Sequence, residues 1–263
     1  MCVHLVLCDP YIKTMRKSVI ISGAGSGIGR AMAIRLSELN FDCYLLGRNT
    51  VNLQKTLIAL RDGDHYVLSA DVRKKESLSN TLHLLRRPVD ALVANAGIGG
   101  ENNWGTNDRW TDILDTNLTG TYNFIHTFLP NLKSSSAAYK NIVITSSVLA
   151  RLGVANYSAY CASKAGLLGL MRSMAIELAN DKVLVNAICP GWVNTQMSQE
   201  GMQGIAKSIG VSVEEFYEMA MQSVPLRKMS EPSEIADLVA YLLHQQSITG
   251  QTFDINNGAI MNS

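Results

Sequence analysis

The chain of 263 residues predicts an α/β fold, a single doubly wound parallel sheet of about seven strands with helices on both faces. Three observations predict it. Strand-like apolar runs alternate with helix-like runs along the chain, a glycine-rich turn joins the first strand to the first helix, and short polar motifs follow the strands one after another. The length suits one α/β domain with a sizeable core. No internal repeat, low-complexity tract or linker divides the chain.

The expected elements follow in order. Strands are expected near residues 18–22, 42–47, 65–70, 90–94, 140–146, 182–188 and 251–255. Helices are expected near 27–39, 51–61, 75–86, 108–130, 157–179 and 232–243, the last beginning at the pair Glu231-Pro232. Because strands and helices alternate, the strands are expected to be parallel, with their ligand-binding ends at one edge of the sheet.

The domain is expected to span residues 15–263, and residues 1–14 are expected to be an N-terminal extension outside the core. The first eight residues are apolar, but the run stops at Asp9-Pro10 and has no basic leader. A secretory signal is therefore not expected.

Composition excludes several function classes. The net charge is +1, with no basic stripe and no interleaving of aromatic and basic residues, which argues against a nucleic-acid partner. No apolar stretch is long enough to cross a bilayer, so no membrane partner is expected. The five cysteines are odd in number and fit no metal motif, which indicates reduced thiols in a cytoplasmic protein without a metal site.

A glycine-rich turn follows the first expected strand. The β-branched run at 19–21 leads into the spacing Gly23-x-x-x-Gly27-x-Gly29, and a helical pattern follows. Glycines permit a tight turn and let a pyrophosphate approach the helix N-terminus, where free N–H groups favour anions. A glycine turn without a ligand is the alternative, but the strand before it and the helix after it favour a nucleotide site.

Tyr160 and Lys164 carry the strongest chemical signal. They lie four residues apart in a helical pattern, so both side chains share one helix face. A nearby ammonium is expected to lower the pKa of the phenol, so that Tyr160 can give or take a proton near neutral pH. Ser147 follows a run that predicts a buried strand, and its hydroxyl can bond to the oxygen that Tyr160 protonates. For such a pair taken alone, a solvated helix face is the alternative.

Further motifs accompany this pair in a fixed order. They are Ser22-Gly23-Ala24-Gly25-Ser26-Gly27-Ile28-Gly29, Asp71-Val72, Asn95-Ala96-Gly97, Asn117, Ser147, Tyr160-x-x-x-Lys164 and Pro190-Gly191-Trp192-Val193-Asn194-Thr195. Together they resemble the short-chain dehydrogenase/reductase family, in its single-domain, ketoreductase-like branch, from Ser18 to about Asn257. Serine at position 22 replaces the family's usual threonine, and Asn257 stands where the family often has glycine.

The resemblance implies a Rossmann-type fold and a role for each motif. The implied catalytic residues are Asn117, Ser147, Tyr160 and Lys164. The implied cofactor-binding residues are Gly23, Ser26, Gly27, Ile28, Gly29, Asp71, Val72, Asn95, Ala96, Gly97, Tyr160, Lys164, Pro190, Gly191, Val193 and Thr195. The implied substrate-binding residues are Leu149, Asn156 and Trp192.

At three of these positions a purely structural role is the alternative to a functional one. Asp71 could cap the helix that follows it, since aspartate often does so. Residues 95–97 could form a plain turn. Asn117 could face solvent, although asparagine is poor inside a helix; the resemblance implies instead a helix irregularity that holds a water joined to Lys164.

The resemblance implies an NAD(P)-dependent oxidoreductase that interconverts a ketone and a secondary alcohol. Hydride would pass from the cofactor to the carbonyl carbon, while Tyr160 gives the proton, Ser147 orients the oxygen and Lys164 holds the ribose. Residues 225–226 and 248–251 are similar to those of acyl-thioester and polyketide ketoreductases, so a 3-oxoacyl-type compound is the favoured substrate class. A dehydrogenase of a small secondary alcohol or ring hydroxyl, and a non-catalytic dinucleotide-binding protein, remain open.

Two further expectations concern the outside of the domain. Relatives of this kind are commonly tetramers built through two long helices, so a homotetramer is expected, with a dimer next. The stretch 196–224 carries four methionines, which suits either a mobile apolar lid or a helix core. It is expected to help set substrate specificity.

The cofactor is expected to be NADP(H), with NAD(H) possible. NAD sites place an acidic residue after the second strand to bind the ribose 2′-hydroxyl, whereas a nearby arginine accommodates a 2′-phosphate. Here Gly47 stands at the acidic position and Arg48 follows it. Arg48 can therefore donate charge-assisted hydrogen bonds to the phosphate. A solvated loop arginine is the alternative.

Overall fold

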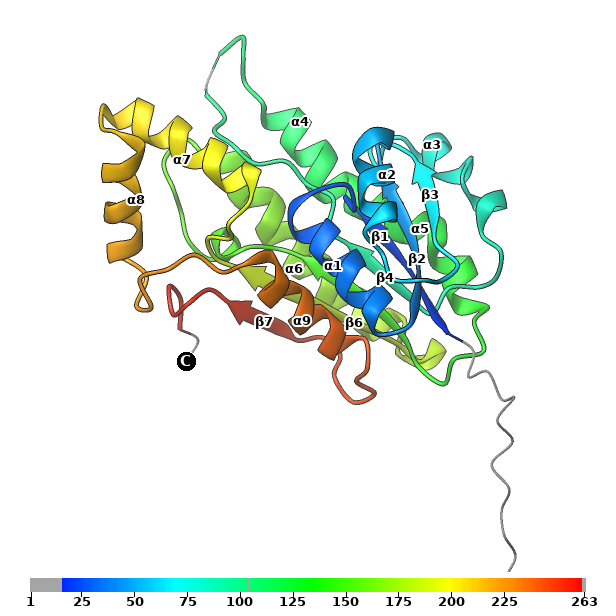
Figure 1. The fold of residues 1–263 in the computed structure, drawn as a ribbon. Helices are drawn as coiled ribbons and strands as arrows, with labels where there is room; N and C mark the ends of the chain where they lie inside the picture. The colour runs from blue at the N-terminus through cyan, green and yellow to red at the C-terminus, as the bar shows by residue number, and fades with distance from the viewer. Residues whose placement is uncertain (1–15, 104, 262–263) are drawn as a thin grey trace, which may run out of the picture.

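The sheet predicted from the sequence is present in the computed structural model, which describes residues 16–103 and 105–261 (Figure 1). Seven parallel strands pair in the order β3-β2-β1-β4-β5-β6-β7. Their bounds are β1 Lys17–Ser22, β2 Phe41–Gly47, β3 Tyr66–Ser69, β4 Ala91–Ala94, β5 Lys140–Thr145, β6 Val183–Pro190 and β7 Thr252–Ile255. The strand order reverses between β1 and β4, the kind of switch point where open α/β sheets bind ligands.

Helices cover both faces of the sheet. Their bounds are α1 Gly27–Glu38, α2 Thr50–Ile58, α3 Lys75–Ser79, α4 Trp110–Leu114, α5 Gly120–Lys133, α6 Ser158–Glu177, α7 Gln196–Ile209, α8 Val213–Gln222 and α9 Pro232–Leu242. Single turns of 3₁₀ helix lie at Leu82–Leu84, Val148–Ala150 and Ala179–Asp181, and a π-helical segment spans Asp115–Thr119. None of the helices among the described residues has the length and apolarity needed to cross a membrane.

Two hydrophobic layers hold the helices to the sheet. Alternate residues of a strand point to opposite faces, so Val19 and Ile21 pack with α1, α2 and α9, whereas Ile20 packs with α3, α5 and α6. The apolar face of α6, Leu167, Leu168, Met171 and Met174, belongs to the second layer. These four residues are therefore core within the chain.

Two expected helices differ from the prediction. The helix expected at 75–86 ends at Ser79, and a 3₁₀ turn follows after a break. The Thr81 hydroxyl donates to the Leu78 carbonyl at 2.7 Å, so a side chain competes with the helical backbone bonds there. The helix expected at 108–130 is α4 and α5 joined through the π-helical segment, and it continues past Pro130 to Lys133.

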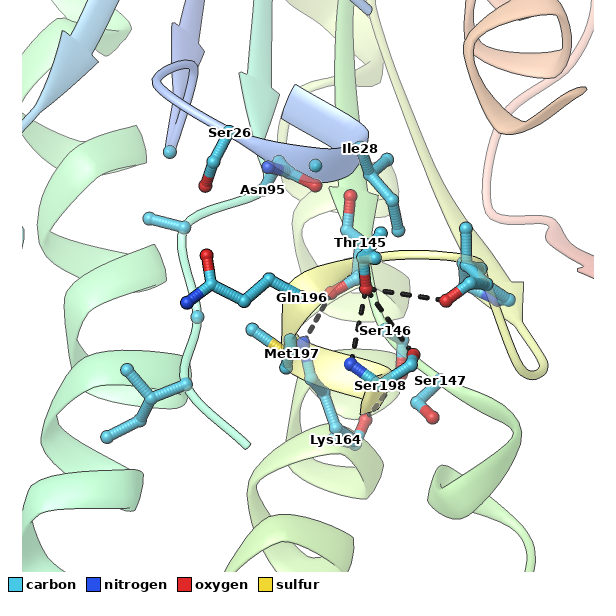
Figure 2. Close-up of a pocket in the computed structure, with 18 of the residues that line it drawn as sticks. Ser26, Ile28, Asn95, Thr145, Ser146, Ser147, Lys164, Gln196, Met197 and Ser198 are labelled. Atoms are coloured by element: carbon cyan, nitrogen blue, oxygen red, sulfur yellow. Dashed lines mark hydrogen bonds between the residues drawn. The ribbon is translucent and has the colours of Figure 1, made fainter. Parts of the chain in front are cut away.

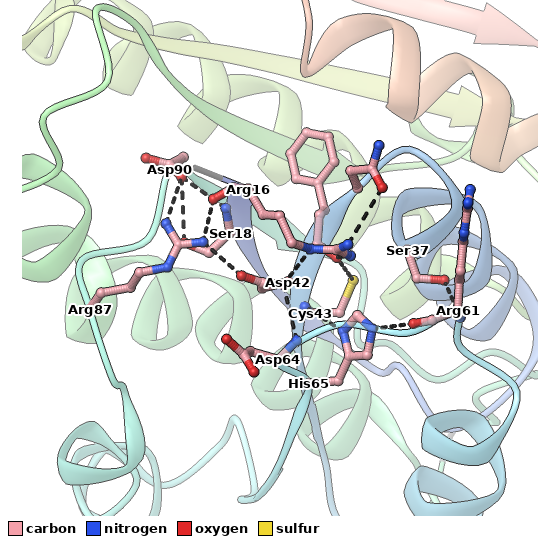
Figure 3. A network of polar contacts seen from close by, with 12 residues as sticks. Arg16, Ser18, Ser37, Asp42, Cys43, Arg61, Asp64, His65, Arg87 and Asp90 are labelled. Atoms are coloured by element: carbon pink, nitrogen blue, oxygen red, sulfur yellow. Dashed lines mark hydrogen bonds and ion pairs between the residues drawn. The ribbon is translucent and has the colours of Figure 1, made fainter. Parts of the chain in front are cut away.

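A polar network joins the amino ends of the central strands (Figure 3). The carboxylate of Asp42 in β2 accepts from Arg16 Nε at 2.7 Å and from Arg87 Nη2 at 2.9 Å. Asp90, just before β4, accepts from the backbone N–H of Ser18 at 2.8 Å. The network fixes the start of the sheet from residue 16 onward. The expected extension at residues 1–14 lies outside the described residues.

Helices α7 and α8 project beyond the carboxyl ends of the strands (Figure 1). Met202 and Met221 are buried in a small cluster with Val224, against which Trp192 and Phe216 pack. Met197 and Met219 are exposed. The stretch expected to be either a lid or a helix core is thus a helix pair with its own small core and two exposed methionines.

Candidate active site

A cavity of about 230 Å³ opens at the carboxyl ends of β1, β4, β5 and β6 (Figure 2). It brings together most of the predicted site residues. Those lining it are Gly23, Ser26, Gly27, Ile28, Asn95, Ala96, Gly97, Ser147, Tyr160, Lys164, Pro190, Gly191, Val193 and Thr195. Motifs far apart in the sequence therefore meet in one space.

The glycine turn between β1 and α1 requires glycine at two of its positions. Gly23 has φ +69°, in the left-handed region that favours glycine. A Cβ at Gly29 would lie 2.2 Å from the carbonyl oxygen of Gly23. Ser26, the N-cap of α1, makes no side-chain capping bond, so the first N–H groups of this helix face the cavity without a side-chain partner. The turn fits the phosphates of a dinucleotide.

The turn after β4 is held to the glycine turn by hydrogen bonds. The Ser22 hydroxyl accepts from the N–H groups of Asn95 at 2.9 Å and Ala96 at 3.0 Å. The Asn95 amide donates to the Ser22 carbonyl at 3.3 Å. Serine thus keeps the hydroxyl function expected at position 22, and residues 95–97 are fixed beside the cavity.

Tyr160 and Lys164 lie in the first half of α6 and both line the cavity. The ammonium Nζ of Lys164 lies 5.6 Å from the centroid of the Tyr160 ring and donates to the Thr145 carbonyl at 2.9 Å. Ser147 ends the extended segment after β5, and its Oγ accepts from the N–H of Leu149 at 3.1 Å. Ser147 also hydrogen-bonds the Tyr160 hydroxyl. A phenol, a hydroxyl and an ammonium thus meet at one wall.

The electrostatics of this pair differ from the expectation. Burial raises the pKa of Tyr160 to about 12, and the hydrogen bond with Ser147 only partly opposes it. Burial also lowers the pKa of Lys164 to about 8. The prediction that the ammonium would lower the tyrosine pKa is wrong for the free protein, because desolvation outweighs the ion, which lies over the ring. The phenol is therefore a neutral proton donor at physiological pH.

Asn117 is fully buried within the π-helical segment. Its Oδ1 accepts from the N–H of Ile98 at 2.8 Å, and its Nδ2 donates to the Ile98 carbonyl at 3.0 Å and to Ser163 Oγ at 3.1 Å. The solvent-facing alternative is therefore wrong. A Cβ built on Gly97 would lie 3.2 Å from Asn117 Oδ1 and 3.6 Å from Lys164 Nζ, so both atoms border Gly97.

The segment after β6 forms a further part of the cavity wall. Gly191 approaches the chain so closely that a Cβ there would lie 3.0 Å from the Cα of Asn256. Thr195 caps α7, and its Oγ1 accepts from the N–H of Ser198 at 3.3 Å. Six further residues line the cavity: Ile98, Thr145, Ser146, Gln196, Met197 and Ser198. Ile98 and the stretch that begins at Gln196 were expected to help set substrate specificity, whereas Thr145 and Ser146 were not predicted as site residues.

Three residues expected to bind the cofactor, Arg48, Asp71 and Val72, lie outside this cavity. Arg48 is exposed after β2, and Asp71 follows β3. The Asp71 carboxylate is bound by the Arg73 guanidinium at 2.7 Å, which lowers the pKa of Asp71. Asp71 does not cap α3, whose N-cap is Lys74. Val72 packs in the core, where its Cγ2 lies 2.7 Å from a Cβ built on Gly120.

The three expected substrate residues do not line the cavity. Leu149 lies in the 3₁₀ turn after Ser147, and Asn156 is an exposed residue with φ +62°. Trp192 packs edge to face with Phe216 of α8, with ring centroids 6.5 Å apart.

The structure explains why asparagine can stand at position 257, where the family often has glycine. Its φ is +55°, a conformation that glycine adopts freely and asparagine tolerates better than most residues. Its side chain donates to the Lys228 carbonyl at 3.0 Å and to Ser230 Oγ at 3.1 Å. Asparagine therefore replaces the family's glycine without losing the turn.

Known proteins share this sequence and this geometry. The profile of the short chain dehydrogenase family matches residues 17–206. A putative ketoacyl reductase of Streptomyces coelicolor is 32% identical over 91% of this chain and 95% of its own length. The 3-oxoacyl-(acyl-carrier-protein) reductase of Staphylococcus aureus strain N315 is 30% identical over 94% of this chain and 99% of its own.

Solved structures of oxidoreductases have the same fold as this chain. An actinorhodin polyketide ketoreductase variant crystallised with NADPH superimposes with a TM-score of 0.87 at 30% identity, over 93% of this chain and 97% of its own. An NAD⁺-bound xylitol dehydrogenase gives 0.85 at 28% identity, over 92% and 98%. The seven-stranded fold is thus that of a known group of oxidoreductases.

Proposed function

The chain belongs to the short-chain dehydrogenase/reductase family of NAD(P)-dependent oxidoreductases acting on ketones and alcohols, and from that premise we propose that it reduces a 3-oxoacyl thioester with NADPH. The observation that carries the chemistry is the wall where Tyr160, Ser147 and Lys164 meet. Relatives named for ketoacyl and 3-oxoacyl reduction support the substrate class.

Each residue of this wall has a separate role in the proposed reaction. A bound nicotinamide dinucleotide supplies the hydride. Tyr160, neutral because burial raises its pKa to about 12, donates the proton to the carbonyl oxygen. Ser147 Oγ bonds the same oxygen and orients it. Lys164 has a lowered pKa of about 8 and is still mostly charged at pH 7, so its ammonium would hold the ribose hydroxyls of the bound cofactor.

After Tyr160 has donated its proton, a new proton reaches it through the space beside Gly97. Asn117 Oδ1 and Lys164 Nζ both border Gly97. A water there would contact the amide oxygen and the ammonium together. Asn117 thereby joins the catalytic group through a water, and its buried bonds to Ile98 hold it in place.

The preference for NADPH over NADH follows from the charges of the residues after β2. Within the described residues, no hydrogen bond or ion pair holds the Arg48 guanidinium, which is close enough to Asp71 to lower the pKa of that carboxyl. Gly47 puts no carboxylate against a 2′-phosphate. Asp71 is neutralised by Arg73. A 2′-phosphate would therefore meet positive charge on this side.

The cofactor test compares kcat/KM for NADPH and NADH in the parent and in Arg48→Ala. The parent should prefer NADPH, and the substitution should reduce that preference, since one charge-assisted bond is lost. Arg61→Ala, an exposed arginine beyond the end of α2, is the matched control and should change neither value. A parent that prefers NADH contradicts the proposal.

The substrate test measures loss of 340 nm absorbance with acetoacetyl thioesters of N-acetylcysteamine and coenzyme A, against simple aliphatic and ring ketones. The thioesters should give the highest kcat/KM. A higher value for a ring ketone or small alcohol would move the function to that class. Nucleotide binding without turnover of any ketone would favour a non-catalytic role.

The assembly and location complete the proposal. The outer face of α6 exposes small and apolar residues, Ala162, Ala165, Gly169 and Ile176, together with Arg172 and Ser173, and a second copy can pack on this face. A homotetramer built through this helix is expected. The three cysteines within the described residues are free thiols, which suits the cytoplasm.

A further inference from the structure

Thr145 carries a hydroxyl for which the proposed chemistry has no use. Its Oγ1 is the one buried side-chain polar atom in residues 16–103 and 105–261 that has no hydrogen-bond partner. The residue is 7% exposed and lines the cavity. Leaving a buried hydroxyl without a partner is costly. Its place in a cavity wall indicates that the partner is a ligand.

The backbone around Thr145 is fixed on both sides. The residue ends β5, where it pairs with Ile188 of β6. Its carbonyl oxygen accepts from Lys164 Nζ at 2.9 Å, and the next residue, Ser146, donates its hydroxyl to the Lys164 carbonyl at 2.8 Å. The backbone at Thr145 is therefore held in place by the catalytic helix itself.

The side chain lies on the glycine-turn side of the sheet. Val143, two residues earlier in β5, packs in the layer of α1 and α9, and strand alternation gives Thr145 the same face. The register of β4 and β5 pairs Ala94 with Ile144, so Asn95 is the neighbour of Thr145 across the strands. Figure 2 shows Thr145 on the part of the cavity wall that carries Ile28 and Asn95.

Thr145 thus borders Lys164, whose proposed role is to hold the ribose. It also lines the same cavity as Val193 and Thr195, which the family resemblance implies bind the cofactor. We propose that the Thr145 hydroxyl forms a hydrogen bond with the nicotinamide riboside half of the bound dinucleotide. A hydroxyl is both donor and acceptor, so either a ribose oxygen or an amide group can serve as its partner. The inference rests on the proposed dinucleotide site.

The test uses a matched pair of substitutions. Thr145→Val removes the hydroxyl at nearly constant shape, and Thr145→Ser keeps the hydroxyl. Dissociation constants for NADP⁺, NAD⁺ and 2′,5′-ADP, which lacks the nicotinamide riboside, are measured by calorimetry, with the Tm of the ligand-free proteins. Thr145→Val should weaken whichever dinucleotide the parent binds more tightly by about 3- to 10-fold, the usual worth of one hydrogen bond.

Two other measurements make the result specific. The affinity for 2′,5′-ADP should be unchanged in Thr145→Val, and Thr145→Ser should bind the dinucleotide like the parent. The ligand-free Tm of Thr145→Val should stay equal or rise, because the variant loses a buried hydroxyl that has no partner. Affinity and ligand-free stability should therefore move in different directions.

Three results would overturn the inference. They are an unchanged dinucleotide affinity in Thr145→Val, an equal loss for 2′,5′-ADP, and a clear fall in the ligand-free Tm of Thr145→Val, which would mean that the hydroxyl already has a partner. A parent that binds no dinucleotide at all would instead refute the proposed function, so the two failures are distinguishable.

Discussion

At the level of single residues, burial governs the charges at the catalytic wall. The spacing of Tyr160 and Lys164 correctly predicts a shared helix face, because that depends only on helical geometry. Their pKa directions could not be predicted, because desolvation depends on strands and loops distant in the sequence. The outcome is a neutral phenol beside an ammonium that releases its proton more easily than usual.

Replacing Tyr160 by phenylalanine removes the proton donor and little else. We expect kcat to fall by about 10²- to 10⁴-fold, the usual worth of a general acid, while the dissociation constant for NADPH stays within about twofold. Tyr157→Phe is the control, since that buried ring contacts the Tyr160 ring edge to face and keeps its packing without the hydroxyl. A Tyr160→Phe enzyme with most of its turnover would contradict the assignment.

Lys164 makes stability depend on pH. Its pKa is about 8 in the folded chain, against 10.5 for an unperturbed lysine side chain. Between these values the unfolded chain holds more protons at this lysine, so the contribution of Lys164 to the free energy of unfolding rises with pH from about 8 to 10.5 and is lowest below 8. Lys164→Met abolishes this rise.

Chemical denaturation of both proteins from pH 7 to pH 10.5 measures the effect. The stability of Lys164→Met relative to the parent should decline over that range by on the order of 2–3 kcal/mol. A constant difference would show that the ammonium is not desolvated.

At the level of elements, tertiary contacts decide what local pattern leaves open. The strands were predicted to within one or two residues, because most of them are apolar runs that are buried on both faces. The π-helical segment could not be placed, although Asn117 indicated an irregularity. Its partners, Ile98 and Ser163, lie 19 and 46 residues away. The same holds for α7 and α8, whose shared core forms only when Met202 meets Met221 and Val224.

The glycines of α7 give a prediction about helix stability. Gly204 lies inside the helix, and nothing lies within 4 Å of a Cβ built there. Gly204→Ala should raise the free energy of unfolding by about 0.5–1 kcal/mol, since alanine loses less backbone entropy in a helix.

Gly210, the C-cap of the same helix, is the control. It also has open space around it, but its φ is +76°. Gly210→Ala should therefore lower stability. Urea denaturation of the two variants decides the matter, and a shift of the same sign in both would mean that backbone conformation is not the cause.

At the level of the whole molecule, the parallel sheet and its two helical layers were predicted from the alternation of strands and helices, whereas assembly remains a prediction. Ile176 is 81% exposed on α6. Ile176→Glu should dissociate the tetramer in light scattering at micromolar concentration. Ile58→Glu, at an 84% exposed isoleucine on α2, should leave the tetramer intact. A monomeric parent would refute the assembly.

Removal of residues 1–14 tests the domain boundary. Arg16 and its bonds to Asp42 remain in the shortened chain, so the Tm and the NADPH affinity should be unchanged. A fall of several degrees in Tm would place part of that segment within the fold.

The strands of the sheet separate two kinds of polar chemistry. Their carboxyl ends hold the cavity, while their amino ends hold Arg16, Asp42, Arg87 and Asp90 (Figure 3). Residue 16 therefore enters the sheet on the side remote from the cavity. If the enzyme were attached to a solid support beside Arg16, the cavity would face away from the support. Attachment at this end would therefore leave the cavity accessible in an immobilised catalyst.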